Sequence, residues 1–152
     1  MMKEAQEPAA ETGGVGEMLC FSIYSAGHAF NALYRPLLDE IGLTYPQYLV
    51  MVALWNRDGQ RVKELGDALF LDSSTLTPLL KRMEAAGLVT RTRNPDDERQ
   101  VLLNLTEKGW GLRERAQTVS TCIQEAVGLD AEAVKKIQTA VEAIRDGIHN
   151  RT

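Results

Sequence analysis

Residues 73–82 place small hydroxyl side chains and cations at the spacing of one helix. Ser74, Thr77 and Lys81 share one side of that helix, whereas the opposite side is apolar. Hydroxyl groups reach base edges and phosphates in a DNA major groove without bulk, and Lys and Arg neutralise phosphate. An ordinary surface helix has the same two-sided pattern, so the pattern alone leaves both interpretations open. If the helix contacts DNA, the contacting residues are Ser73, Ser74, Thr75, Thr77, Lys81 and Arg82.

Two runs of alternating apolar and polar residues follow this helix, at 88–93 and 100–105. The Asn, Pro and Asp residues of 94–97 separate them and predict a turn, so we expect a β-hairpin. An arginine at the tip of a hairpin can enter the minor groove, where shape and potential are read. Arg99 is placed there, and Asp97 can orient it through an ion pair, although an exposed pair without this role contributes little. The candidate DNA contacts of the hairpin are Arg91, Arg93, Asp97 and Arg99.

The chain has two cysteines, Cys20 and Cys122. A thiolate is the nucleophile toward peroxides, and the sulfenic acid that it forms condenses with a second thiol to give a disulfide. The ordinary alternative is that each cysteine is a small apolar residue of a helix. We expect no metal site, because His28 and His149 do not cluster with the cysteines in the sequence, and no cofactor.

Two helices are predicted ahead of the helix that carries the hydroxyl groups. Residues 17–41 have apolar side chains in alternating steps of four and three, a seam that can pack against a partner chain. Gly42 is expected to end this helix. Thr44 is placed to cap the next helix, over 47–55, which is apolar on nearly all sides and is therefore expected in the core.

The hairpin and the two helices before it have the pattern of a winged helix-turn-helix. A short helix over 62–69 is joined by a brief link to the second helix, which Asp72 or Ser73 can cap and which Gly87 is expected to end. Pro78 removes one backbone hydrogen bond, so we expect an irregular first turn. In the short helix, the side chains expected to point inward are Val62, Leu65, Ala68 and Leu69.

Two further helices are predicted after the hairpin. Thr106 is placed to cap a long helix over 107–128, and Asp130 to cap a last helix over 131–150. The last helix has a single apolar stripe. The expected fold class is therefore mainly α-helical with a small β-hairpin wing.

Length and composition fit one domain, since the chain has 152 residues and a hydrophobic fraction of 44%. A net charge of −4 gives no overall basic field, so DNA contact would depend on local charge. Four cations and one anion lie between Lys81 and Arg93. Residues 1–16 are polar and lack an apolar stretch, which predicts a disordered arm and no signal peptide. No run is long enough to span a membrane, so we expect a cytoplasmic protein with reduced thiols.

The order of elements and the wing sequence resemble the MarR family of dimeric bacterial repressors. The resemblance extends from Met18 to about Ile148. Its most specific part is the motif D-x-R-x-x-x-x-x-L-T-x-x-G, read from Asp97, Arg99, Leu105, Thr106 and Gly109. It implies a winged helix-turn-helix with a helical dimerisation region in one domain. The implied parts are a single domain over 17–150, a DNA-binding lobe over 60–105, and dimerisation and core parts over 17–58 and 106–150.

Within this family, several segments resemble the repressors that respond to organic hydroperoxides, called OhrR. These segments are Leu19-Cys20-Phe21, Tyr34, Thr44 to Tyr48, and Leu71 to Lys81. The resemblance implies that Cys20 is the peroxide sensor, that Tyr34 and Tyr45 hydrogen-bond it, and that Cys122 captures the oxidised sensor as an intersubunit disulfide. Phenol donors would favour the thiolate. Cys20 and Tyr34 lie roughly 21 Å apart along one helix, so if Tyr34 serves this thiolate it must come from the other chain.

The function predicted in this way is that of a homodimeric transcriptional repressor and not of an enzyme. The reduced dimer would bind double-stranded DNA at a near-palindromic operator, with two recognition helices in successive major grooves. Under oxidative stress, an organic hydroperoxide would oxidise Cys20, and the disulfide with Cys122 would release the DNA. One alternative is a MarR-type repressor that a small phenolic ligand releases and whose cysteines are structural. A more distant alternative is a thiol peroxidase, which would be expected to show a thioredoxin-like pattern or a C-x-x-C motif.

Overall fold

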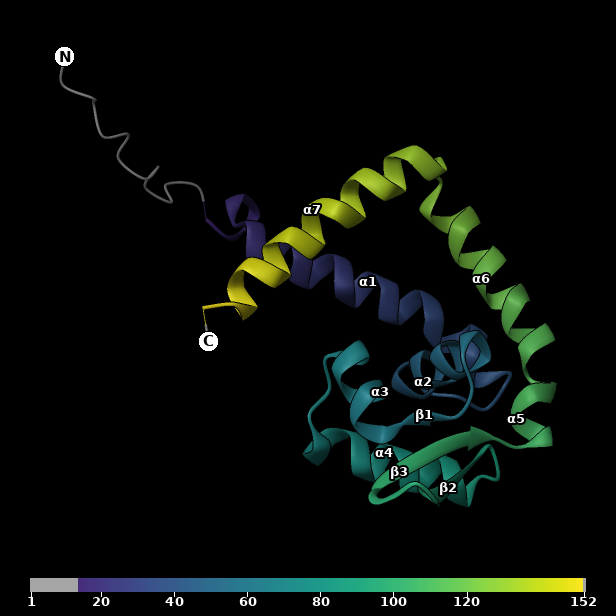
Figure 1. Cartoon of the computed structure of the whole chain (residues 1–152). Coiled ribbons are helices and arrows are strands. Elements are labelled where there is room, and N and C mark those ends of the chain that lie inside the picture. The colour runs from purple at the N-terminus through teal and green to yellow at the C-terminus, as the bar shows by residue number, and fades with distance from the viewer. Residues whose placement is uncertain (1–13, 152) are drawn as a thin grey trace. The chain divides into compact units, whose positions relative to one another are not determined.

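The structure is a computed structural model that describes residues 14–151, and it is mainly helical (Figure 1). It divides into two compact units, one ending at Gly111 and the other beginning at Leu112. The first unit contains η1 (Val15–Glu17), α1 (Leu19–Asp39), α2 (Tyr45–Asn56), β1 (Gln60–Arg61), α3 (Val62–Leu69), α4 (Ser73–Ala85), β2 (Val89–Asn94), β3 (Asp97–Leu105) and α5 (Glu107–Gly111). The second contains α6 (Arg113–Val127) and α7 (Ala131–His149).

The N-terminal arm is described only in part. Residues 1–13 of the predicted disordered segment lie outside the described residues. Residues 15 and 16 were expected in that arm, but they form a short 3₁₀ helix directly before α1. No helix among the described residues is long and apolar enough to cross a membrane.

The core of the first unit is built around α2. Its first turn has the expected cap, since the Thr44 hydroxyl accepts a hydrogen bond from the Gln47 backbone and the Gln47 side chain accepts one from Thr44. The side chains that α2 buries are Tyr48, Val50, Met51, Leu54 and Trp55. The helix was expected to be buried on nearly all sides, but Val52 is exposed, so one edge of α2 remains at the surface.

Three antiparallel strands form the sheet, in the order β1-β3-β2. The hairpin of β2 and β3 was predicted, whereas β1 was read as part of a turn because two residues carry no periodic pattern. Gln60 begins β1 and is buried. Its side-chain amide donates to the carbonyls of Ala53 (3.0 Å) and Arg57 (2.7 Å), which satisfies the C-terminal end of α2.

The helices α3 and α4 form the predicted helix-turn-helix. In α3, Leu65 is buried as expected, but Ala68 is exposed and Gly66 is buried in its place. A Cβ atom on Gly66 would lie 3.0 Å from the Leu71 carbonyl oxygen, so the turn between the helices passes directly over this glycine. This close approach explains why Gly66 is buried although it has no apolar side chain.

The helix α4 forms as predicted. The Asp72 side chain accepts a hydrogen bond from the Thr75 backbone (2.9 Å), and Gly87 follows the helix with a left-handed φ of 75°. The Leu88 backbone then bonds the Met83 carbonyl at 3.0 Å. The helix runs without interruption from Ser73 to Ala85 in spite of Pro78, although an irregular first turn was expected. The buried side chains are Leu76, Leu79, Leu80 and Met83, as expected.

The long helix predicted over 107–128 is instead two helices, α5 and α6, interrupted at Leu112. Two glycines, Gly109 and Gly111, lie directly before the interruption and lower the helix propensity there. Gly109 is required by packing, because a Cβ atom at this position would lie 2.3 Å from the Leu88 carbonyl oxygen. Its own carbonyl accepts a hydrogen bond from the buried Trp55 indole at 3.0 Å, so α5 belongs to the first unit.

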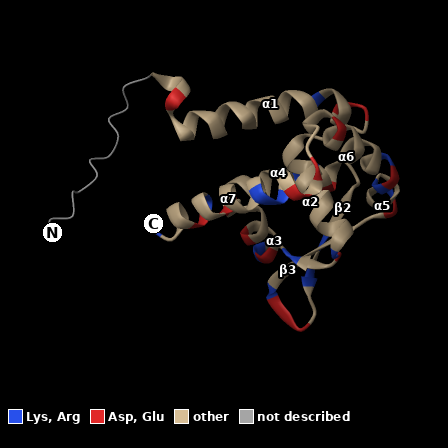
Figure 2. Cartoon of the chain, turned by 90° about the horizontal axis from the view of Figure 1, so that it is seen from above, with Lys and Arg blue, Asp and Glu red and all other residues tan. Residues whose placement is uncertain are grey.

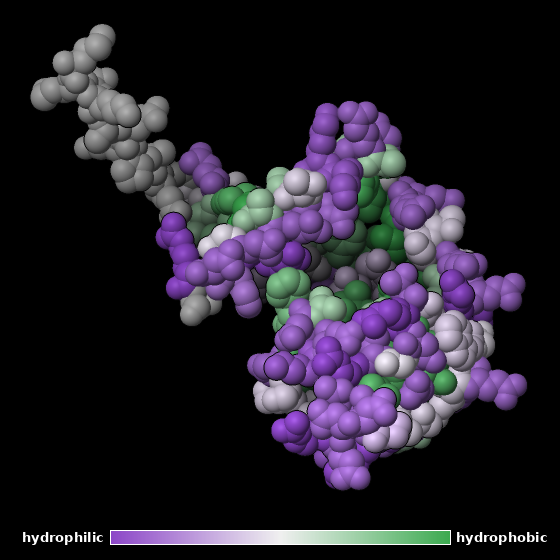
Figure 3. Space-filling view, in the orientation of Figure 1, coloured by the Kyte–Doolittle hydropathy of each residue, from purple (hydrophilic) through white to green (hydrophobic). Residues whose placement is uncertain are grey.

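Exposed apolar faces occur in both units. The N-terminal part of α1 has hydrophobic residues at the surface (Figure 3), and Leu19 is 61% exposed. In the second unit, Asp130 caps α7 through the Ala133 backbone at 2.8 Å, as predicted. The apolar stripe of α7 lies at the surface, and Ile148 is 63% exposed. The exposed large residues are Leu19, Phe21, Ile23, Tyr24 and Phe30 on α1, and Val134, Ile137, Val141 and Ile148 on α7.

Candidate nucleic-acid interface and cysteine site

The outer face of α4 carries the predicted contact residues. Thr77 is half-buried, and the exposed residues are Ser73, Ser74, Thr75, Lys81 and Arg82. At the start of the helix, the Ser74 hydroxyl donates to Asp72 at 2.6 Å. This bond and that from the Thr75 backbone hold the pKa of Asp72 below its ordinary value. The helix therefore presents hydroxyl groups, two cations and one ionised carboxylate to the solvent.

The wing carries charged residues of both signs, with acidic residues at its tip (Figure 2). Arg99 is the residue best placed to reach outward, since its side chain is 90% exposed. Its Nε lies 3.2 Å from Asp97 Oδ1, and its backbone N–H donates to the same oxygen at 3.1 Å. The predicted ion pair between Asp97 and Arg99 is therefore present and fixes the backbone where β3 begins.

The other two arginines of the wing have different surroundings. Arg91 is only 29% exposed at its side chain, which lies 3.4 Å from Glu84 of α4. The Arg91 backbone also donates to Glu84 at 3.1 Å, and these contacts hold the pKa of Glu84 below its ordinary value. Arg93 donates to the Glu98 carbonyl at 3.4 Å across the hairpin. Arg91 thus joins the wing to α4, which sequence reasoning did not foresee.

The C-terminal end of α4 is bound to the start of α5. The Thr106 hydroxyl donates to the Gly87 carbonyl (2.5 Å), and Lys108 donates to the Ala86 carbonyl (2.8 Å). Thr106 also accepts from the Gly109 backbone at 3.1 Å, which is the predicted cap. The threonine and glycine of the motif therefore have structural contacts, because they join the end of α4 to the start of α5.

The two cysteines lie in different units. Cys20 is the second residue of α1 and is exposed. Cys122 lies in α6 and is half-buried. Neither forms a disulfide in the described chain. A thiol at the surface near the start of a helix is accessible to an oxidant.

Three tyrosines cluster where α1 meets α2. The ring of Tyr34 lies 4.9 Å from that of Tyr45 and 5.7 Å from that of Tyr48, measured between ring centroids. Sequence reasoning paired Tyr34 with Tyr45 but missed Tyr48, which looks like an ordinary core residue of α2. Burial, with smaller effects of Tyr48 and Tyr45, raises the pKa of Tyr34 to about 12. The Tyr34 hydroxyl therefore stays protonated at neutral pH and can act as a hydrogen-bond donor.

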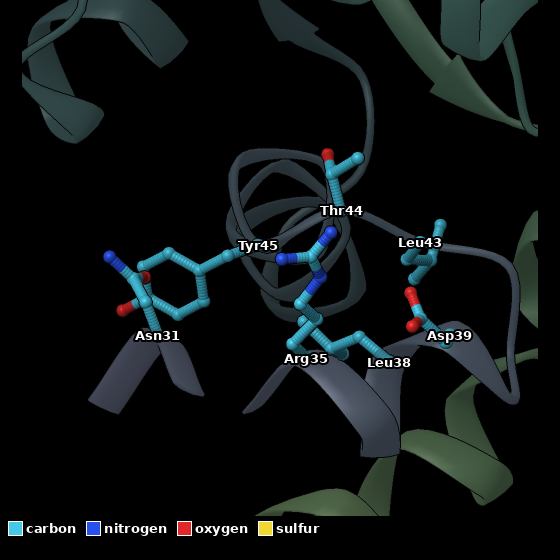
Figure 4. Close-up of a pocket in the computed structure, with 7 residues that line it drawn as sticks. All are labelled: Asn31, Arg35, Leu38, Asp39, Leu43, Thr44 and Tyr45. Carbon is cyan, nitrogen blue, oxygen red and sulfur yellow. The ribbon is translucent and has the colours of Figure 1, made fainter. Parts of the chain in front are cut away.

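A cavity of about 360 Å³ lies beside these tyrosines, between α1 and α2. Arg35 extends from α1 toward Thr44 and Tyr45, while Asp39 lies at the opposite end near Leu43 (Figure 4). The cavity is thus mainly apolar, with one cation and one carboxylate at its rim. No group of three potential metal ligands occurs among residues 14–151.

A helix-turn-helix with an exposed hydroxyl face, followed by a hairpin with an exposed arginine near its tip, defines a winged-helix DNA-binding protein. The family model described as "Transcriptional regulator SarA/Rot" matches residues 32–115. The chain belongs to this family of MarR-like winged-helix transcriptional regulators.

Individual relatives agree with this family and with the predicted fold class. The chain is 47% identical over 133 residues to the HTH-type transcriptional regulator TtmR of Methylorubrum extorquens (88% of this chain, 68% of TtmR). It is 41% identical over 133 residues to the organic hydroperoxide resistance transcriptional regulator of Bacillus subtilis (88% and 90%). The crystal structure of AbfR of Staphylococcus epidermidis is similar with a TM-score of 0.75 at 36% identity (87% and 91%). These relatives are transcriptional regulators and not enzymes, as was predicted for this chain.

Proposed function

We propose that this protein is a homodimeric cytoplasmic repressor that senses organic hydroperoxides through Cys20. The observation that carries the proposal is the 41% identity to the Bacillus subtilis organic hydroperoxide regulator, which spans α1 with its exposed cysteine as well as the DNA-binding elements. The tyrosine cluster adds a group of phenols, one of which is held protonated.

The DNA-binding part of the proposal rests on α4 and on the wing. AbfR, at 35% identity, has been solved in its reduced form bound to DNA. In this chain, α4 would lie in the major groove, with its hydroxyl groups and Lys81 facing the DNA. Arg99 would enter the minor groove. The contact between Arg91 and Glu84 favours a positioning role for Arg91 over direct contact.

The dimer would cover the apolar faces of α1 and α7. Burial of apolar area is the main driving force of such association. Cys20 and Tyr34 lie roughly 21 Å apart along α1, so Tyr34 cannot reach Cys20 of its own chain. In the dimer, a second copy would supply the phenol. Tyr34 and Tyr45 of one subunit would then donate to Cys20 of the partner subunit.

The proposed reaction has two steps. The Cys20 thiolate attacks the peroxide oxygen; the O–O bond breaks, the alkoxide leaves and takes up a proton, and Cys20 becomes a sulfenic acid. The Cys122 thiol of the partner subunit then attacks the sulfenic sulfur, an S–S bond forms and water leaves. AbfR, which has also been solved with a disulfide formed, is the precedent for such a state in this family. A disulfide needs Cα atoms within about 7 Å; if the two reduced cysteines lie farther apart than this in the dimer, forming the bond must move helices and rotate the winged domains.

A second candidate function is suggested by the cavity between α1 and α2. Its apolar lining and the Arg35 guanidinium suit a small aromatic anion, which would make the protein a ligand-released repressor with structural cysteines. Asp39 on the same rim opposes an anion, so this candidate has less support.

Mass spectrometry of peptides under non-reducing conditions distinguishes the two candidates. The purified dimer is treated with one equivalent of cumene hydroperoxide, beside the variants Cys20→Ser and Cys122→Ser. The proposal expects a linked peptide pair that contains Cys20 and Cys122, and a sulfenic acid trapped by dimedone at Cys20 in Cys122→Ser. An unmodified Cys20 would contradict the sensor. DNA release by a phenolic acid that fails in Arg35→Ala would then support the second candidate.

A further inference from the structure

We propose that Asp72 and Ser74 act as one acceptor-only pair that reads an exocyclic amino group, of cytosine or of adenine, in the major groove. The inference rests on the proposed DNA binding by α4 and assigns a specificity to two residues at its start. Sequence reasoning places Ser74 among the contacts but does not say whether it donates or accepts, and it gives Asp72 only a capping role.

The direction of the hydrogen bond follows from the chemistry of the two groups. An ionised carboxylate has no proton to donate, whereas a serine hydroxyl has one. The 2.6 Å separation between Ser74 Oγ and Asp72 Oδ1 is that of a charge-assisted bond. The lowered pKa of Asp72 keeps the carboxylate ionised at neutral pH. The single proton of Ser74 is therefore directed at Asp72, and only its lone pairs face outward.

The position of the pair, at the start of α4, is suited to contact with base edges. Asp72 is held by a second bond, from the Thr75 backbone at 2.9 Å, so its side chain is fixed over the first turn of α4. Both Asp72 and Ser74 are exposed. The first turn of a recognition helix is the part that meets base edges.

An acceptor-only pair discriminates among bases. Cytosine N4 and adenine N6 offer hydrogens in the major groove, whereas guanine O6 and N7 and thymine O4 offer lone pairs. Lone pairs that face each other across the groove leave both groups without a partner, which is costly once water is excluded. The pair should therefore favour cytosine or adenine at one position of each half-site and reject guanine and thymine there.

The test is a selection of binding sequences from a random duplex DNA library by the full-length reduced protein. Wild type is compared with Ser74→Ala, Asp72→Ser and the control Asp67→Ser, which removes an exposed carboxylate on α3 that is not among the proposed DNA contacts. Serine is a good N-cap, so Asp72→Ser keeps the cap but frees the Ser74 hydroxyl to donate. Thermal melts confirm that each variant is folded.

We expect the wild-type sites to contain a fixed cytosine or adenine in each half-site, and the selection itself tells which. In Ser74→Ala and Asp72→Ser the preference at that position should fall on the order of tenfold, while Asp67→Ser leaves it unchanged. Asp72→Ser should additionally accept guanine or thymine. Unchanged preference in both variants would overturn the pair and leave the proposed DNA binding intact. No enrichment by wild type would overturn the proposed function, and the pair with it.

Discussion

At the scale of single residues, two wing arginines are expected to have different roles, Arg99 in DNA binding and Arg91 in the stability of the fold. Arg99 is almost fully exposed and is oriented only by Asp97, whereas Arg91 joins β2 to Glu84 of α4. We expect Arg99→Ala to weaken DNA binding on the order of tenfold and to leave the melting temperature unchanged. Arg91→Ala should lower the melting temperature and weaken binding less. Fluorescence anisotropy and thermal melts check both, and equal losses of affinity would contradict the assignment.

The tyrosine cluster makes a prediction about pH. Tyr34 has a pKa raised to about 12, mainly by burial. In a rising pH titration followed by tyrosinate absorbance, Tyr34 should therefore be among the last of the four tyrosines to ionise. The Tyr34→Phe variant should lack the transition near pH 12. Ionisation of all tyrosines near the ordinary value of 10.0 would show that the cluster is not buried in solution.

The sequence predicted where several residues of the candidate DNA interface lie, but not which other residues they contact. The hydroxyl face of α4 and the Asp97–Arg99 pair follow from local spacing and are found as expected. The contact of Arg91 with Glu84 joins residues seven positions apart on different elements, so no periodic pattern indicates it. Tyr48 was overlooked for a similar reason: an aromatic on an apolar helix looks like core until its neighbours are known.

At the scale of elements, the end of α4 is joined to the start of α5 by the contacts of Thr106, Lys108 and Gly109. Gly109 is the residue on which this junction depends, because a Cβ atom there would lie 2.3 Å from the Leu88 carbonyl. We expect Gly109→Ala to lower the free energy of unfolding by about 1–3 kcal/mol. Gly111→Ala is the matched control in the same helix, since nothing lies within 4 Å of its Cβ position.

The control should leave stability unchanged or raise it by up to about 1 kcal/mol, because alanine is the better helix former. Chemical denaturation of both variants measures the difference. Equal stability of Gly109→Ala and Gly111→Ala would show that the junction does not constrain α5.

The helices that have a capping residue in their own sequence were predicted well. The caps at Thr44, Asp72 and Asp130 bond backbone groups within three residues, so the sequence alone indicates them. The strand β1 and the close packing of Gly109 depend on neighbours far away in the sequence, β3 for the strand and Leu88 for the glycine. Such features become visible only when the packing is known.

At the scale of the whole molecule, the exposed apolar face of α7 predicts self-association. We expect Ile137→Glu to shift the protein from dimer to monomer in sedimentation at micromolar concentration, because the charge would be buried in the proposed interface. Lys135→Glu, two residues away on the same helix, should remain dimeric. A dimeric Ile137→Glu would remove this face from the interface.

The most direct test of the account is the affinity of the reduced protein for its selected DNA, before and after one equivalent of cumene hydroperoxide. We expect the affinity of wild type to fall at least about tenfold, which corresponds to 1.4 kcal/mol, and dithiothreitol to restore it. Cys20→Ser should bind DNA with or without peroxide. Affinity of wild type that does not change with peroxide, while Cys20 is shown to be reduced at the start, would contradict peroxide sensing and leave a winged-helix regulator with a different signal.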